Sequence, residues 1–135
     1  MNTENLDVIK KSFVTKEIAE KLKEKGFDFP VIALYDFRGY FTLYDYELRA
    51  SNLICPLFSQ VTDWLEEKHQ IFIDIETDCT TYPKFAYSIN KFVGNPKDLA
   101  EKEWYWEHPK PDNWFLYRTR NEALEEAIKF ALTLI

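Results

Sequence analysis

Apolar side chains recur at helical spacing in three segments of the chain. The last segment is the clearest, because its apolar residues form one continuous stripe at i, i+3, i+4, i+7, i+8 and i+11. This stripe consists of Leu124, Ala127, Ile128, Ala131, Leu132 and Ile135. Thr119 and Glu122 stand at the spacing of a capping box where this helix would begin. Such a stripe has to be buried, so we expect the helix to dock on a sheet.

Two further helices are predicted upstream. Thr15 can cap a helix over residues 15–25, and Gly26 stands where a left-handed residue would end it. Residues 57–69 carry a second amphipathic pattern, and Pro56 can occupy the first turn of that helix, where a missing N–H costs nothing.

Apolar and polar residues alternate between these helices, which is the period of half-buried strands. The predicted strands form two hairpins, and Gly39 supplies the positive φ that the first turn needs. The strands cover residues 31–35, 40–44, 71–76 and 85–90, and the alternation over 114–119 also fits a fifth strand. The other stretches lack this period, so 46–56 and 104–111 are predicted to be loops and 96–103 to be one or two helical turns.

These elements follow the order α-ββ-α-ββ(β)-α. Hairpins imply antiparallel pairing, because links this short cannot contain a helical crossover. We therefore expect an α+β fold in two layers, with an antiparallel sheet of four to five strands and the helices on one face. The length of 135 residues fits a single domain over 1–135.

Composition narrows the classes of function. The chain has 17 Lys and Arg residues against 23 Asp and Glu residues, a net charge of -6, which argues against a nucleic-acid partner. The polar N-terminal residues do not resemble a signal peptide, and no apolar run is long enough to span a membrane. Cys55 and Cys79 are interpreted as reduced thiols of a cytoplasmic protein, with a single bridge between them as the alternative.

Aromatic residues supply 17% of the chain, and four of them lie in or beside the irregular stretch before the last helix. They are Trp104, Tyr105, Trp106 and Trp114. Large rings on a surface bind partners at a low entropic cost, and they can also stack on bases or sugars. The competing interpretation is that these rings fold back and cover the open face of a small sheet.

His69 is the second candidate, because it lies between a helix and a strand that carries Asp74, Glu76 and Asp78. A histidine with carboxylates can bind a divalent metal or transfer protons. The favoured interpretation is structural: His69 interacts with the helix dipole, and the carboxylates form the solvated side of a strand. We expect no cofactor, and nothing in the sequence places a histidine beside Cys79, as a nucleophilic thiol would need.

Three stretches of the chain resemble a group of small phage-related or hypothetical proteins of gut bacterial genomes and their prophages. They are residues 13–27, 56–69 and 121–135, which together make up about a third of the chain. These stretches determine a fold and carry no chemical motif, and the group has no assigned activity. The resemblance therefore implies a cytoplasmic, phage-derived protein and no site residue, and residues 94–113 form a longer segment than is usual in the group.

The sequence favours a non-enzymatic interaction module that binds a host or phage protein through its aromatic segment. The alternative is a small metal-dependent hydrolase that uses His69 with Asp74, Glu76 or Asp78. An acidic mimic of nucleic acid ranks last, because the negative charge is modest and evenly spread.

Deletion of residues 124–135 removes the apolar stripe of the last helix. Because the remaining chain would expose the surface on which this helix docks, we expect an insoluble or molten product. Circular dichroism of the truncated protein during heating measures this directly. A cooperative melt of the truncated chain would contradict a docked last helix.

Overall fold

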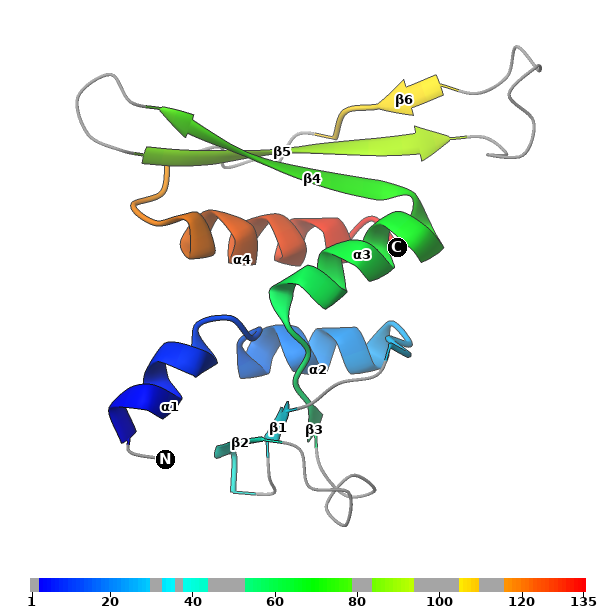
Figure 1. Cartoon of the computed structure of the whole chain (residues 1–135). Helices are drawn as coiled ribbons and strands as arrows, with labels where there is room; N and C mark the ends of the chain where they lie inside the picture. Colours follow the sequence, from blue (N-terminus) through cyan, green and yellow to red (C-terminus); the bar gives the residue numbers. More distant parts are fainter. Residues whose placement is uncertain are drawn as a thin grey trace. The chain divides into compact units, whose positions relative to one another are not determined.

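The protein is described here by a computed structural model. The described residues are 3–29, 33–35, 38–43, 53–78, 84–93, 105–109 and 116–135. Within them the chain forms four helices and six strands, so the predicted α+β class is confirmed (Figure 1). The chain divides into two compact units, Met1–Trp64 and Leu65–Ile135, and each is described by itself. The expectation of a single domain stays a prediction.

The first unit contains a three-stranded antiparallel sheet in the order β2-β1-β3. The predicted first hairpin is confirmed as β1 (Ala33–Tyr35) and β2 (Phe41–Leu43), and Gly39 has a φ of +82° in the link between them. β3 (Leu53–Ile54) pairs with the other edge of β1, so the prediction of a loop over 46–56 was wrong at these two residues. A strand of two residues is too short to show a hydrophobic period.

The helix α2 (Lys16–Glu24) begins and ends at the predicted signals. The Thr15 hydroxyl accepts a hydrogen bond from the N–H three residues later, at 3.4 Å. Gly26 adopts a φ of +81° after the helix, and the Phe27 N–H donates back to the Leu22 carbonyl at 3.0 Å. This six-to-one bond is the mark of a Schellman ending, which satisfies carbonyls that the last helical turn would leave unpaired.

An additional helix, α1 (Thr3–Lys10), forms in the polar N-terminal stretch, for which the sequence pattern gave no prediction. After it, the Val14 N–H donates to the Pro56 carbonyl at 3.0 Å. The next residue, Leu57, forms an antiparallel bridge with Phe13, and α3 (Phe58–His69) begins only after it. Pro56 thus lies before the helix, and its predicted place in the first helical turn was wrong.

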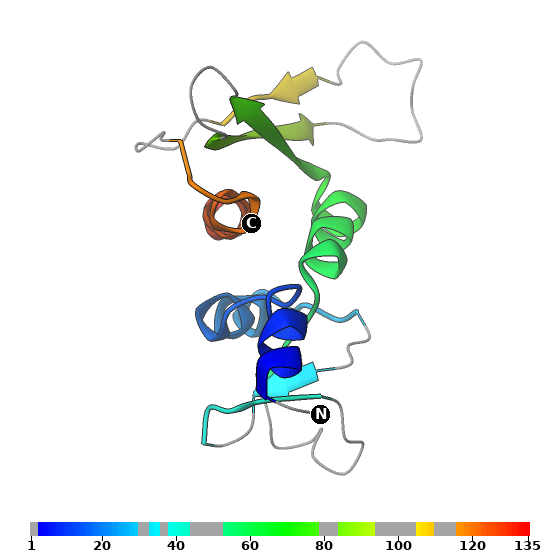
Figure 2. The same ribbon diagram turned by 60° about the vertical axis from the view of Figure 1, so that its left-hand side comes forward.

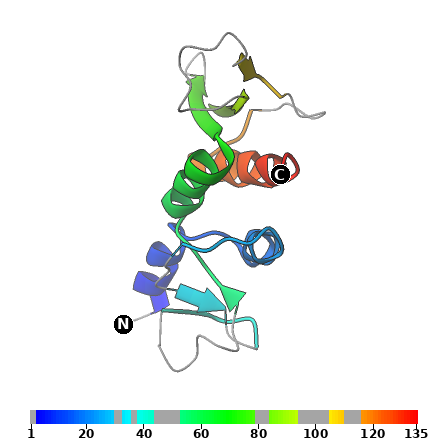
Figure 3. The same cartoon turned by 90° about the vertical axis from the view of Figure 1, so that its right-hand side faces the viewer.

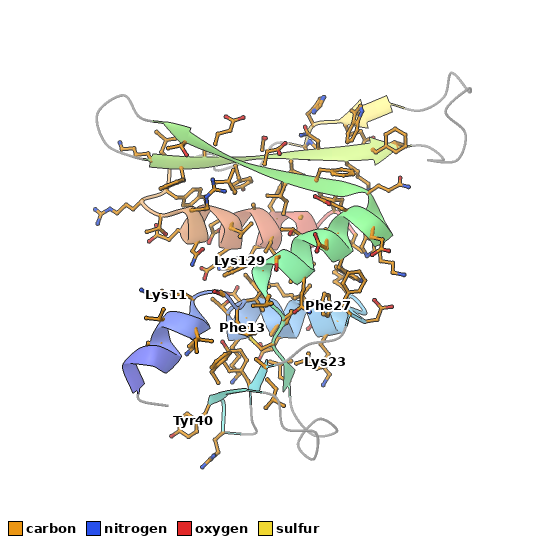
Figure 4. The ribbon with its side chains drawn as sticks, in the orientation of Figure 1. Lys11, Phe13, Lys23, Phe27, Tyr40 and Lys129 are labelled. Atoms are coloured by element: carbon orange, nitrogen blue, oxygen red, sulfur yellow. The ribbon has the colours of Figure 1, made fainter. Side chains whose placement is uncertain are left out.

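Two side chains fix α3 at its start and along its length. The Gln60 side-chain oxygen accepts a hydrogen bond from the Leu57 N–H at 3.0 Å, which is the return half of a capping box. The Trp64 ring is 2% exposed and meets the edge of the Phe27 ring at a centroid distance of 5.4 Å. Figure 4 shows Phe27 at the C-terminal end of α2. The predicted helix over 57–69 is thus confirmed.

The second unit is an antiparallel sheet in the order β4-β5-β6, with α4 (Arg120–Leu132) packed on one face of it (Figures 2 and 3). β4 (Ile71–Asp78) and β5 (Lys84–Val93) confirm the second predicted hairpin. β6 (Tyr105–Glu107) pairs with the end of β5, so the loop predicted over 104–111 was wrong at these three residues. The six described strands are thus shared between two sheets of three, instead of one sheet of four to five.

The last helix packs on the sheet, and most of its fully buried side chains are small. Its Thr119 hydroxyl accepts a hydrogen bond from the Glu122 N–H at 3.1 Å, so the predicted cap is confirmed. The fully buried positions on α4 are Ala123, Ala127, Ile128, Ala131 and Leu132. The buried stripe is therefore rotated toward Ala123, while Leu124 is half-buried and Ile135 is exposed. Three alanines four residues apart allow the helix backbone to approach the strands closely.

Two other expectations concern segments near this unit. The predicted helical turns over 96–103 lie outside the described residues. The fifth strand over 114–119 is described only from residue 116, where Tyr117 forms a single antiparallel bridge with Phe85 of β5. The helices in the described part of the chain include none long and apolar enough to cross a membrane.

Replacement of Gly26 by alanine forces a side chain into the left-handed region. No atom lies within 4 Å of the added Cβ, so the cost is conformational, and we expect Gly26→Ala to lower the free energy of unfolding by about 1 kcal/mol. Urea unfolding followed by circular dichroism measures the change. Lys25→Ala is the matched control, because Lys25 has an ordinary φ of -88°. Equal stabilities of the two variants would contradict a strained position.

Candidate functional site

The candidate site is the face of the β4-β5-β6 sheet that turns away from α4, here called the outer face. Side chains alternate along a strand, so buried Ile71 and Ile89 mark the inner face that α4 covers. The register then places one set of residues together on the outer face, since Phe72 lies opposite Asn90, Asp74 opposite Ser88, and Phe92 opposite Trp106.

Three rings form a continuous cluster on the outer face, here called the aromatic cluster. The Trp106 ring lies 5.4 Å from the Phe72 ring and 5.3 Å from the Phe92 ring, at interplanar angles of 66° and 62°. Such edge-to-face contacts are the preferred geometry of aromatic pairs. Trp106 nevertheless remains 44% exposed, so its ring is held in place and is also open to solvent.

A chain of polar side chains lies beside the aromatic cluster. The Asn90 amide Nδ2 donates to Asp74 Oδ2 at 3.2 Å, which orients the amide and leaves its oxygen as an acceptor. Asn90 Oδ1 lies 2.6 Å from His108 Nδ1, so the proton of a neutral His108 belongs on Nδ1. His108 and Asp74 are both exposed, and these two hydrogen bonds use neither His108 Nε2 nor Asp74 Oδ1.

The four aromatic residues predicted as a binding set do not all lie on the outer face of the described structure. Trp106 is exposed on β6, within the aromatic cluster. Tyr105 pairs through its backbone with Val93. Trp104 and Trp114 lie outside the described residues.

Sequence reasoning missed the partners of Trp106. Phe72 was seen only as an alternating strand residue, and Phe92, Asn90 and His108 were not considered part of a site. The alternation along β4 and β5 could have indicated which of their side chains share a face. The pairing of β6 could not be predicted in this way, because three residues are too few to show an alternation.

The alternative metal site combines His69 with the carboxylates of β4. His69 ends α3, and burial together with the charge of Lys91 lowers its pKa. The amine of Lys91 donates to the Leu134 carbonyl just after α4, on the inner side of the sheet, whereas Asp74 bonds Asn90 on the outer face. Glu76 is exposed on the outer face, and the Asp78 side chain is outside the description.

Among the described residues, no group of three or more His, Cys, Asp or Glu side chains is arranged to hold a metal ion. Within this part of the chain, His69 and the β4 carboxylates therefore do not form a metal site.

The Cys55 thiol of the first unit is buried and hydrogen-bonded. Its Sγ donates to the Val14 carbonyl at 3.2 Å, and the Tyr35 hydroxyl donates to the same oxygen at 3.3 Å. Burial raises the pKa of Cys55 from 9.0 to about 12, against smaller lowering effects of Tyr35 and Lys10. Cys55 is a free thiol that stays protonated at neutral pH, and Cys79 lies outside the described residues.

In comparisons with known proteins, the chain matches no family model, no curated protein and no solved structure.

The Cys55 thiol is expected to react with alkylating reagents only after unfolding. The folded state binds the thiol proton more tightly, so the stabilisation from this group is complete below pH 9.0 and is lost as the pH rises toward about 12. In a Cys79→Ser background, iodoacetamide at about pH 8 should modify the native protein roughly 100-fold or more slowly than the urea-unfolded chain. Mass spectrometry measures both rates. Rates within tenfold of each other would contradict a buried thiol.

Proposed function

We propose that the protein is a non-enzymatic protein-interaction module that binds its partner through the outer face. The observation that carries this proposal is the exposure of Trp106, 44% open while two phenylalanine rings hold it. A ring that is already fixed loses little conformational entropy on binding. Tryptophan is also among the residues that contribute most to protein interfaces.

The charges of the outer face favour a protein over a nucleic acid as the partner. Asp74 and Glu76 are exposed on this face. If the bases of a nucleic acid stacked on Trp106, these carboxylates would repel its phosphate groups. The net charge of -6 acts in the same direction. That the partner is a host or phage protein stays a prediction, which rests on the sequence resemblance alone.

Substitution of Trp106 by alanine tests this proposal. The tagged wild-type protein and Trp106→Ala are used as baits for proteins of the source cell, and the affinity for any stoichiometric partner is then measured by calorimetry. We expect a loss of roughly 2 kcal/mol or more, a factor of about 30, because an exposed anchor ring is removed.

The control variant is Tyr40→Ala, which removes another exposed ring that projects from the β1–β2 hairpin of the first unit (Figure 4). This variant should retain the partner, and neither variant should change the melting temperature as a core substitution such as Trp64→Ala would. Retention of the partner by Trp106→Ala would contradict the proposal. Unfolding of Trp106→Ala would instead show that the ring serves the fold.

A further inference from the structure

The outer face carries a negative charge in addition to the exposed indole. Phe72 and Asp74 are two residues apart on β4, so their side chains stand on the same face about 7 Å apart. Trp106 reaches across to the Phe72 ring. The indole and the carboxylate therefore flank the same phenylalanine.

Both groups are available to a ligand. The Asp74 side chain is exposed, and its described hydrogen bond from Asn90 uses Oδ2 and not Oδ1. Asn90 is itself held by His108 at 2.6 Å, so the carboxylate is oriented from one side. Glu76, two residues further along β4, adds a second exposed carboxylate to the face.

The described basic side chains of this sheet lie away from the acidic ones near Trp106. On the described part of the outer face, the basic residue Lys84 stands at the opposite end of the sheet, where the register pairs it with Asp78. Lys91 points to the inner side, toward the Leu134 carbonyl. The described residues of the outer face around Trp106 and Asp74 are thus aromatic and negative.

We propose that this region binds an arginine side chain of a basic segment in a partner protein, with the guanidinium plane on Trp106 and its N–H groups on Asp74. Arginine fits better than lysine, because a planar guanidinium can stack on a ring and donate several hydrogen bonds to a carboxylate at once. The inference rests on the proposed function and names the chemistry of its partner. A second copy of the chain fits poorly, since symmetric pairing of this face would oppose Asp74 and Glu76 to their own copies.

A titration of the full ¹⁵N-labelled protein tests the inference. The probe is a short blocked peptide of alternating glycine and arginine, and a peptide of alternating glycine and glutamine is the uncharged comparison. We expect the arginine peptide to shift the indole resonance of Trp106 and the amide resonances of β4 to β6. The affinity should fall about two- to fivefold in Asp74→Asn, the range of an exposed ion pair, and should fall further as salt is added.

The matched control is Asp63→Asn, which removes the same charge from an exposed position of α3 and should leave the affinity unchanged. Equal binding of the two peptides, or an unchanged affinity in Asp74→Asn, would overturn the arginine site. If a captured partner were then still lost on Trp106→Ala, the interaction module would stand without this chemistry. If the partner also survived Trp106→Ala, both proposals would fail.

Discussion

The second unit depends on the close packing of one helix against one face of a three-stranded sheet. Ala123, Ala127 and Ala131 are fully buried and four residues apart, so they form a line of small buried side chains along α4, the helix that packs on β4 and β5. One helix covers one face only. The opposite face therefore has to satisfy its apolar side chains among themselves, and it does so by packing the rings of Phe72 and Phe92 against Trp106.

The elements that sequence predicted are those specified by neighbours along the chain. The cap of α4 needs only Thr119 and Glu122, and the end of α2 needs only Gly26 at a positive φ. The elements that it missed depend on distant partners. β6 pairs with the end of β5, where Trp106 lies opposite Phe92, and three residues carry too little pattern to predict such a pairing. The two short sheets were predicted as one for the same reason, because strand order is a property of the packed chain.

The candidate site was predictable in one part and not in the other. Trp106 stood out because rings were concentrated near it in the sequence. The polar chain could not be foreseen, because Asp74, Asn90 and His108 come from β4, from β5 and from the residue after β6, which only the pairing of the strands brings together. The same register places Asp74 on the face opposite Lys91, whose charge acts on His69, so among the described residues the proximity in sequence yields no group of side chains arranged to hold a metal ion.

The polar chain is difficult to explain as a contribution to stability. Asp74 and His108 are exposed, and an exposed hydrogen bond exchanges one partner for water at little net gain, about 1 kcal/mol or less. Its physical effect is orientation: Asn90 bonds one oxygen of the carboxylate and so restricts its rotation, on the same face as a ring that two phenylalanines contact. Groups fixed in this way before binding lose little entropy when a ligand arrives. Orientation of an exposed charge beside an exposed ring serves recognition, whereas the fold of this unit is already secured on the other face by α4.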